Sequence, residues 1–455
     1  MKNIPVKNSR AKHIGTLIAF FLLSIVGNAS DQVPAPPQTH PIALQGGMIH
    51  TLAGDAINGG TVLVENGKIT AVGETVTLPD NTEVIDITGK HIYPGFIAAN
   101  TALGLTEIAA VRATRDYAET GKINPNVRAE VAFNPDSELL PVVRANGIAL
   151  ALSIPAGGII SGTSALMLLD GWTWEEMTLK APVGLHLHWP YMGINRAPWV
   201  RKKPEEQLKE RDRQIEQIRK TFADARAYLK AKKSESNKGV LYHDTDSRWE
   251  AMVPVLQREV PVFVHANEIR QIQAAVDWAS GENIKMVLVG GYDSWRVADL
   301  LKEKEIPVII TATHRLPMRR WEAYDTPFTL PLKLQQAGVK FCIAGPGGAF
   351  NTAHARNLPY QAATAAAYGL PREEALKAIT LYPAEILGVA EQVGSVEVGK
   401  DATLIVTDGD PLEIMTHVEM EFIRGRKIDL SNKQTELYEK YREKYRRINA
   451  DANND

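Results

Sequence analysis

The stretch HIYPGFIAANTALGL, residues 91–105, lies where the chain changes from one sequence pattern to another. Before it, apolar and polar residues alternate in short runs, and Asn66-Gly67 is a strong signal for a hairpin turn between two of these runs. After it, apolar runs are followed by segments with helical periodicity. The stretch therefore marks the entry from a small β region into a larger α/β region.

The larger region repeats one plan, an apolar run that leads into a helical segment. The runs lie at 147–154, 260–264, 285–289, 307–310 and 339–344. This alternation predicts a parallel sheet with crossover helices. Over roughly 300 residues the expected closed form is a TIM-like (β/α)8 barrel, with its active site at the carboxyl ends of the strands. An open doubly wound sheet is the alternative, although no G-x-G-x-x-G turn marks a dinucleotide site.

The two ends of the chain carry similar short strands, which return at 394–406 and 418–428. Each end alone is too short to bury a core, so we expect them to pair into one composite β-sandwich domain. A charged helix with one apolar stripe, Pro204 to about Lys232, is expected on the outside of the barrel. The predicted organisation is a linker at 30–41, a β domain at 42–92 and 393–429, a barrel at 93–392 with a helical insertion at about 196–235, and a C-terminal helix or tail at 430–455 that packs on the body.

The N-terminus has the composition of a secretory signal, residues 1–29. Basic residues precede the apolar run Ile14 to Val26, and Gly27-Asn28-Ala29 supplies small residues for cleavage. The apolar run of about 13 residues is shorter than the roughly 20 that span a bilayer, which makes a permanent anchor the second interpretation. We therefore expect a periplasmic or secreted protein without a stable membrane span.

The overall charge is nearly balanced, with 51 Lys and Arg against 53 Asp and Glu. This balance gives no indication of nucleic acid as a partner, and a small-molecule ligand or substrate is expected instead. Cys342 is the single cysteine, so no disulfide can form within the chain.

Three stretches resemble the amidohydrolase superfamily, close to its imidazolonepropionase-like group. They are TGKHIYPGFI at 88–97, VPVFVHANEIRQIQAAVDWA at 260–279, and the long stretch from GLPREEALK to DGDPLE at 369–413. The resemblance covers roughly residues 42–428. It implies the same β domain and barrel, and a hydrolase that acts on carbon–nitrogen bonds of non-peptide or cyclic amides.

The resemblance also implies a divalent metal, usually zinc, that activates water. Its ligands would be a His-x-His pair in the first barrel strand, a His on the fifth and on the sixth, and an Asp after the eighth. These positions fall on Asn100 and Ala102, His265, Gly290 or Gly291, and Pro346. Only His265 is retained, so we expect a degenerate binuclear site with zinc absent or weakly bound.

Other polar residues follow the predicted strands. His265, His314 and Asp293 are the candidate catalytic acid and base groups, and with His354 they are also the candidates for a relocated metal site. The candidate ligand-binding residues are Asn100, Tyr292, Arg315 and His354.

The passage around His186-Leu-His188 has the spacing of the missing pair but lies far downstream of it. We expect it to be an ordered excursion over the barrel mouth. Trp172, Trp174, Trp189 and Trp199 in the same passage suit either a flat ligand or the burial of the long helix.

Three hypotheses follow. The first is an exported hydrolase of carbon–nitrogen bonds. The second is a non-catalytic relative that binds a ligand, forms an oligomer or pairs with a catalytically complete relative. The third is a metal-free enzyme. The number of retained ligands favours the second, and the family resemblance favours the first.

Overall fold

The computed structural model describes residues 32–234 and 244–452. The expected signal segment lies outside these residues. All elements named below belong to one compact unit, 34–455.

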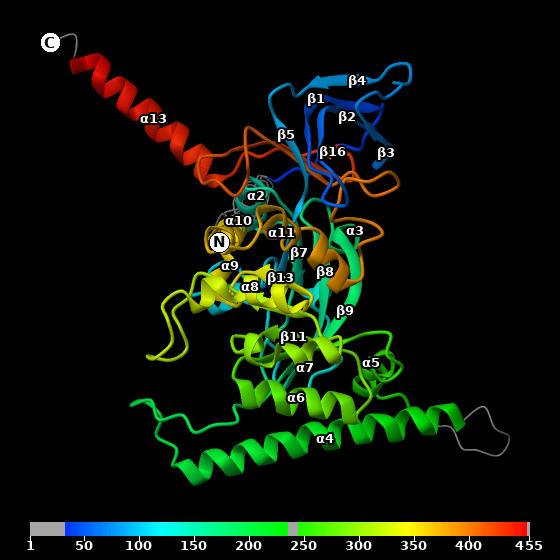
Figure 1. Ribbon diagram of the computed structural model, residues 1–455, viewed down its shortest axis with the longest axis vertical. Helices are drawn as coiled ribbons and strands as arrows, with labels where there is room; N and C mark the ends of the chain where they lie inside the picture. Colours follow the sequence, from blue (N-terminus) through cyan, green and yellow to red (C-terminus); the bar gives the residue numbers. More distant parts are fainter. Residues whose placement is uncertain (1–31, 235–243, 453–455) are drawn as a thin grey trace, which may run out of the picture. The chain divides into compact units, whose positions relative to one another are not determined.

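One sheet is built from both ends of the chain (Figure 1). Its order is β16-β15-β14-β5-β1-β2-β3, and β4 pairs with β1. The join between the two ends is the antiparallel pair β5–β14. Asn66 and Gly67 both have positive φ, as a two-residue hairpin turn requires. The strands are β1 (Ile42–Ile49), β2 (Ile57–Glu65), β3 (Lys68–Gly73), β4 (Glu83–Asp86), β5 (His91–Pro94), β14 (Leu404–Thr407), β15 (Val418–Ile423) and β16 (Arg426–Lys427).

The second sheet is a nearly closed barrel of eight strands in the order β13-β12-β11-β10-β9-β8-β7-β6. This confirms the predicted α/β barrel with an additional sheet from both chain ends. The strands are β6 (Phe96–Thr101), β7 (Ile148–Ser153), β8 (Ile160–Leu168), β9 (Thr178–His188), β10 (Val262–Ala266), β11 (Met286–Gly290), β12 (Val308–Thr311) and β13 (Phe341–Ala344).

One barrel strand departs from the all-parallel plan. β8 runs antiparallel to both β7 and β9, whereas the other paired strands of the sheet run parallel. Only residues 154–159 join β7 to β8, which is too short for a crossover helix. Gly157 and Gly158 in this connection both have positive φ and allow the chain to turn straight back.

Helices surround the barrel and lead from one strand to the next. Their bounds are η1 (Arg112–Thr114), η2 (Ala129–Ala132), α2 (Leu139–Arg144), α3 (Trp174–Met177), α4 (Pro204–Ser234), α5 (Ser247–Leu256), α6 (Ile269–Gly281), η3 (Ser294–Val297), α7 (Ala298–Glu303), α8 (Thr326–Ala337), α9 (Ala349–Thr352), η4 (Ala355–Asn357), α10 (Leu358–Ala367), α11 (Arg372–Lys377), α12 (Leu381–Leu387) and α13 (Lys433–Ala452). No helix in the described ranges has the length and apolar character needed to cross a membrane.

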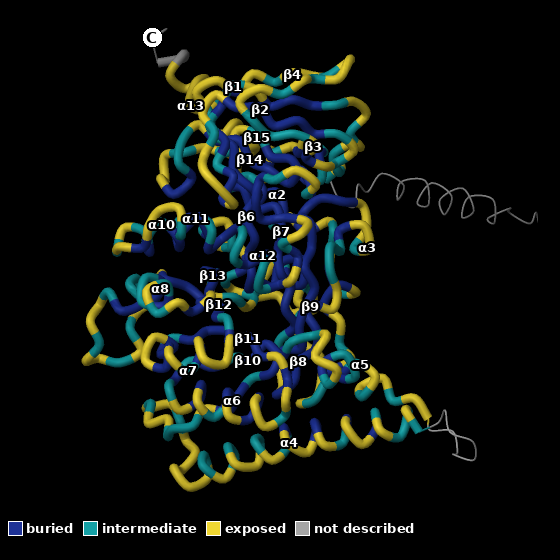
Figure 2. The backbone as a smooth tube through the Cα atoms, turned by 45° about the vertical axis from the view of Figure 1, so that its right-hand side comes forward, coloured by how far each residue is buried: buried dark blue, intermediate teal, exposed yellow. Residues whose placement is uncertain are grey.

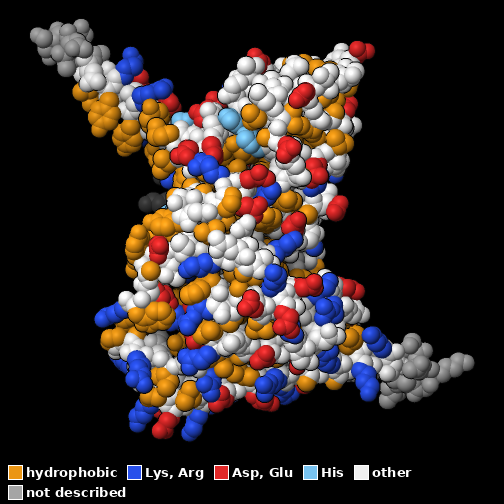
Figure 3. All heavy atoms as spheres, viewed as in Figure 1, with side chains coloured by type: hydrophobic (Ala, Val, Ile, Leu, Met, Phe, Trp, Pro, Cys, Tyr) orange, Lys and Arg blue, Asp and Glu red, His pale blue; other side chains and the backbone are white. Residues whose placement is uncertain are grey.

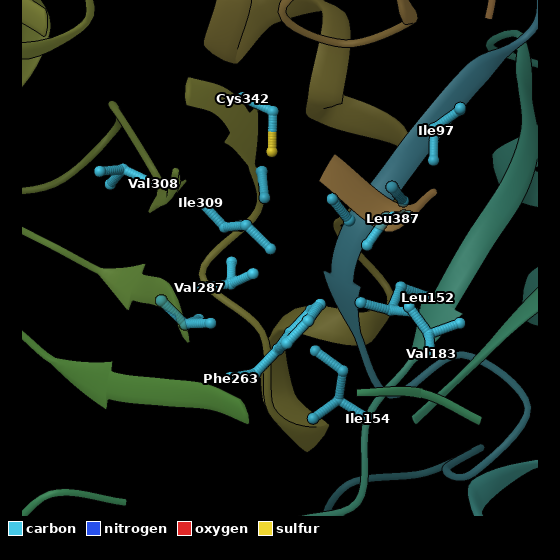
Figure 4. Close-up of a cluster of buried hydrophobic side chains, with 14 of the residues drawn as sticks. Ile97, Leu152, Ile154, Val183, Phe263, Val287, Val308, Ile309, Cys342 and Leu387 are labelled. Atoms are coloured by element: carbon cyan, nitrogen blue, oxygen red, sulfur yellow. The ribbon is translucent and has the colours of Figure 1, made fainter. Parts of the chain in front are cut away.

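The interior of the barrel is filled by apolar side chains. Figure 4 shows Ile97, Phe263, Val287 and Cys342 converging from different strands. All four are buried, and burial raises the pKa of the Cys342 thiol. The barrel is therefore a packed core, and a ligand site has to lie at one of its ends.

The long helix α4 confirms the expected amphipathic helix outside the barrel. Its buried side includes Ile218, Phe222 and Ala225, while most of its other side chains are exposed (Figure 2). The Phe222 ring meets Trp278 of α6 edge-on, with 4.9 Å between the ring centroids.

The expected packing of the C-terminal helix on the body is wrong. Between Lys433 and Asn449, every residue of α13 is exposed except Glu443, which is half-buried. Figure 1 shows α13 leading away from the two sheets. An amphipathic pattern predicts that one face is covered, but it does not say by what.

Candidate functional site

A cavity of about 350 Å³ lies at the carboxyl ends of the barrel strands. Its walls come from the end of almost every strand. They include Asn100, His188, His265, Gly290, Thr311 and Gly347. This is the end at which barrel enzymes place their active sites.

A larger cavity, about 600 Å³, opens at the amino ends of the strands and is lined by Lys180, Lys285 and Lys340 among others. We assign the candidate site to the smaller cavity, because buried polar atoms without partners lie there.

Three histidines meet at one wall of the smaller cavity. His188 on β9 pairs in register with His265 on β10, and their rings stack with centroids 4.2 Å apart. His186 lies two residues before His188, so both side chains leave the same face of β9. Its Nδ1 is 2.9 Å from Nε2 of His265. The result is a contiguous cluster of three imidazoles.

Burial sets the charge of this cluster. It lowers the pKa of His186 and of His265 well below the usual value, and the neighbouring imidazoles lower both further. Burial also lowers the pKa of His188. All three rings are therefore neutral at pH 7, when each imidazole carries one donor and one acceptor nitrogen.

Two polar atoms at the cavity are buried without a hydrogen-bond partner among the described residues. They are Nε2 of His188 and Oδ1 of Asn267, and both residues line the cavity. Buried polar groups in proteins are nearly always hydrogen-bonded. Both side chains line the cavity, so we take these two atoms as the candidate contacts for a bound molecule.

Two glycines make room for the amide side chains at the mouth. A Cβ on Gly290 would lie 2.2 Å from Oδ1 of Asn267, and one on Gly347 would lie 2.4 Å from Nδ2 of Asn100. Both glycines also have positive φ. Asn267 thus occupies the space into which a side chain at position 290 would project.

The metal implied by the resemblance can be tested against these contacts. Asn100 donates from Nδ2 to the carbonyl of Gly345 at 3.0 Å, and Nε2 of His265 faces His186. Within 32–234 and 244–452, no group of three or more His, Cys, Asp or Glu side chains is placed to hold a metal ion.

The structure brings three of the predicted site residues into the cavity wall, namely His265, Asn100 and Tyr292. It does not bring His314 or His354 there, since both are exposed and the His314 Nε2 bonds Thr364 Oγ1 at 2.6 Å. Neither residue is among those that line the cavity.

Asp293 also lies away from the cavity wall. Its carboxylate accepts two hydrogen bonds from Arg319, at 2.8 and 2.5 Å, and one from the backbone amide of Ile269. Burial acts to raise the pKa of Asp293, but the bonds and charge of Arg319 and the amide of Ile269 outweigh it and lower the pKa. Asp293 is therefore held as an ionised structural carboxylate.

Arg315 does not line the cavity itself but contacts Tyr292, which does. Its guanidinium lies 3.7 Å from the ring centroid of Tyr292, within cation–π distance. Burial lowers the pKa of Arg315. The residues that line the cavity include no Asp, Glu, Lys or Arg. The cavity wall therefore carries no ionised side chain of its own, and the charge of Arg315 lies against Tyr292 while Glu322 and Asp293 interact with it.

The interpretation of His186 and His188 as part of a loop excursion is wrong. Both lie on β9, an 11-residue barrel strand. The alternation of Val183, Leu185 and Leu187 with these histidines was the available signal. Trp189 is buried against Trp278, with 5.3 Å between the ring centroids, and this packing extends to α4. Asn267 was missed because an asparagine after a strand carries no specific signal.

Comparisons with known proteins agree on one family. A model described as the amidohydrolase family matches residues 173–429. The chain is 22% identical over 382 residues to the amidohydrolase tasK of Hapsidospora irregularis, which covers 78% of this chain and 38% of that protein. It is 32% identical over 148 residues to the imidazolonepropionase of Thermoplasma volcanium, covering 32% of this chain and 34% of that protein.

Among solved structures, the chain is similar to an amidohydrolase from Thermotoga maritima MSB8. The two are 28% identical with a TM-score of 0.75, covering 85% of this chain and 99% of that one. The chain spans 38% and 34% of the lengths of the two curated relatives.

Proposed function

Because the chain belongs to the amidohydrolase family, we propose that it is an exported hydrolase acting on carbon–nitrogen bonds of small, non-peptide or cyclic amides. In this proposal the binuclear metal site of the family is degenerate. The observation that carries the proposal is the cavity at the carboxyl ends of the barrel strands, with the unpaired atoms of His188 and Asn267 at its wall.

The groups at this wall suit an amide. A secondary amide offers an N–H donor and a carbonyl acceptor side by side. The Asn267 Oδ1 accepts from the amide N–H, and the His188 Nε2 donates to the carbonyl when the imidazole carries its proton on Nε2. Neutral imidazoles also supply a base that takes a proton from water. The hydrogen bond to His186 holds the ring of His265 in place beside them.

A binding experiment tests the proposal. The full chain is screened against neutral lactams, cyclic imides and hydantoins, with melting temperature and product formation both recorded. We expect at least one of these compounds to raise the melting temperature. His188→Ala and Asn267→Ala should each weaken binding roughly tenfold, since each removes one hydrogen bond. The exposed His354→Ala serves as the matched control and should bind normally.

A second candidate function is a non-catalytic subunit that binds the same ligand or pairs with a catalytically complete relative. The observation that favours it is the carboxylate of Asp293, which is tied to Arg319 and does not reach the cavity. Binding without product would support this candidate. Absence of both binding and product over the whole series would contradict the hydrolase and the ligand-binding subunit.

The metal is tested separately. Zinc, iron and manganese are measured in the purified chain, before and after incubation with each ion. We expect less than about 0.1 equivalent to remain bound, because a metal centre needs several protein ligands. A full, tightly bound equivalent would contradict the proposed degenerate site.

Export is proposed from the composition of residues 1–29. The test compares the full chain with a chain that begins at Ser30, each expressed in a bacterium and separated into cytoplasmic and periplasmic fractions. We expect only the full chain to reach the periplasm. Equal amounts of both chains in the cytoplasm would contradict export.

A further inference from the structure

Helix α13 carries an apolar stripe that no other part of the described chain buries. At about 100° per residue, five side chains fall in one narrow sector. We call this set the α13 stripe: Leu437, Tyr438, Tyr441, Tyr445 and Ile448. Each of the five is between 42% and 64% exposed. The stripe is visible in Figure 3 as orange side chains along one edge of the projecting helix.

The charged residues of α13 are arranged by sign around the stripe. Glu436, Glu439 and Glu443 all lie about 150–170° from its centre, on the far side of the helix. Lys444 and Arg442 lie on its two flanks. The Arg442 guanidinium is 5.7 Å from the Tyr438 ring centroid, and the Lys444 Nζ is 5.8 and 5.6 Å from the rings of Tyr441 and Tyr445. Cations therefore border the apolar surface directly.

Two of the three glutamates form ion pairs with arginines of the same helix. Glu443 bonds Arg446 and Arg447 at 2.7 and 2.8 Å, and Glu439 bonds Arg442 at 2.5 Å. Over Lys433–Ala452 there are six Lys and Arg against four Asp and Glu. The helix thus carries a local positive charge, although the whole chain is nearly balanced.

We propose that α13 lies on the surface of an anionic lipid bilayer. The stripe would enter the boundary between headgroups and acyl chains, where tyrosine is favoured because its ring is apolar and its hydroxyl stays hydrated. The flanking lysines and arginine reach lipid phosphates along their apolar stems. The glutamates face water. This is a peripheral contact, and it requires no membrane span.

The same charge pattern disfavours a second copy of the chain as the occupant. In an antiparallel helix pair, each flank faces the same flank of the partner, so lysines oppose lysines. In a parallel pair, the Lys444 flank faces the Arg442 flank, which is also positive. Both arrangements place like charges together, whereas an anionic surface neutralises both flanks at once.

Vesicle flotation tests this proposal with the full chain. Vesicles of phosphatidylcholine alone are compared with vesicles in which one third of the lipid is phosphatidylglycerol. We expect at least roughly tenfold tighter binding to the anionic vesicles, weakened by salt. Lys440 lies one turn before Lys444 on the same side of the helix. Tyr441→Ser/Tyr445→Ser and Lys440→Gln/Lys444→Gln should each weaken binding roughly tenfold. The N-terminal segment is unchanged in every variant, so a difference between variants arises in α13.

The matched control removes the same charge from positions farther from the stripe. Arg446→Gln/Arg447→Gln should weaken binding less than about threefold. All variants should melt like the parent, because these side chains are exposed. Equal binding to both vesicle types, or full binding by the tyrosine variant, would overturn the proposal. So would a stripe-dependent dimer in sedimentation without lipid binding.

Discussion

Glu421 on β15 offers a sharp test of the electrostatics of the structure. Its side chain is fully buried, and neither carboxylate oxygen has a hydrogen-bond partner among the described residues. Burial raises the pKa of Glu421, the charge of Arg144 lowers it in part, and Asp170 raises it again, to about 8 from an ordinary value of 4.5. At pH 7 this carboxyl group is therefore protonated in the folded chain.

The perturbation is Glu421→Gln, which keeps the shape and removes the titration. In the unfolded parent chain the carboxyl is ionised at pH 7, which stabilises the unfolded state by about 1.4 kcal/mol for each of the roughly 2.5 pH units above 4.5. The glutamine variant lacks this term. We expect its free energy of unfolding to exceed that of the parent by roughly 3 kcal/mol at pH 7.

The sign of the pH dependence follows from the raised pKa. The protonated carboxyl group of Glu421 makes its full contribution to the stability of the folded parent below pH 4.5, and this contribution is lost as the pH rises through about 8. Between pH 7 and pH 9 the parent should lose about 1.4 kcal/mol that the variant retains. Urea unfolding at pH 7, 8 and 9 measures both differences.

Glu419→Gln, on the same strand but partly exposed and paired with Lys90, is the control and should follow the parent. A Glu421→Gln variant that is less stable than the parent, with the same pH dependence, would refute the reasoning.

Three further predictions concern the barrel. Gly290→Ala should lower the free energy of unfolding by about 2 kcal/mol or more and abolish ligand binding, because the added Cβ meets Asn267 and the φ of this residue is positive. The control in thermal melts is Gly281→Ala, whose added Cβ meets nothing within 4 Å. Arg319→Gln should cost about 3 kcal/mol by urea unfolding, because it leaves the buried carboxylate of Asp293 without its cation. Stability should fall as the pH drops below about 6.5, since the folded chain keeps His186 and His265 neutral while the unfolded chain protonates them; a melting temperature that is flat from pH 7 to pH 5 would contradict the neutral cluster.

The sequence was sufficient for the parts of the fold that repeat a local pattern. The hairpin at Asn66-Gly67, the strand that holds His265 and the stripe on α4 each follow from spacing or turn chemistry within a short window. The strand β8 could not be found in this way. Its direction depends on a six-residue return after β7, and nothing in its sequence, ISGTSALML, separates parallel from antiparallel pairing.

The candidate site was only partly predictable for the same reason. His265 and Asn100 stood out because a resemblance fixed their positions. The contact joins two histidines, His186 and His265, that are 79 residues apart in the chain, and nothing local marks it. The space around Gly290 is decided by Asn267, which directly follows the neighbouring strand β10. Side-chain clusters at a barrel mouth depend on register between strands, which periodicity does not set.

The charge of the cavity leads to a last prediction. Its lining holds neutral histidines and amides and no carboxylate. Arg315 is not part of the lining, but its guanidinium lies against the ring of Tyr292, which is. A cationic ligand would give up its hydration and find no anion to pair with, which costs several kcal/mol. A neutral cyclic amide should therefore bind at least roughly 100-fold more tightly than an analogue of the same shape with a protonated amine.

Calorimetry on such a matched pair measures this ratio directly. Arg315→Gln is the informative variant, because it removes the nearby positive charge while the lining stays the same. This variant should bring the affinities of the neutral amide and the protonated amine closer together. It should weaken binding of the neutral amide by no more than about threefold. A cavity that prefers the amine would mean that an ionised carboxylate reaches the ligand, and Asp293 freed from Arg319 would be the one to examine first. Comparing the neutral and the protonated analogue therefore tests two things. It tests which ligand the cavity prefers, and it tests the contacts with Arg319 that keep Asp293 out of the site.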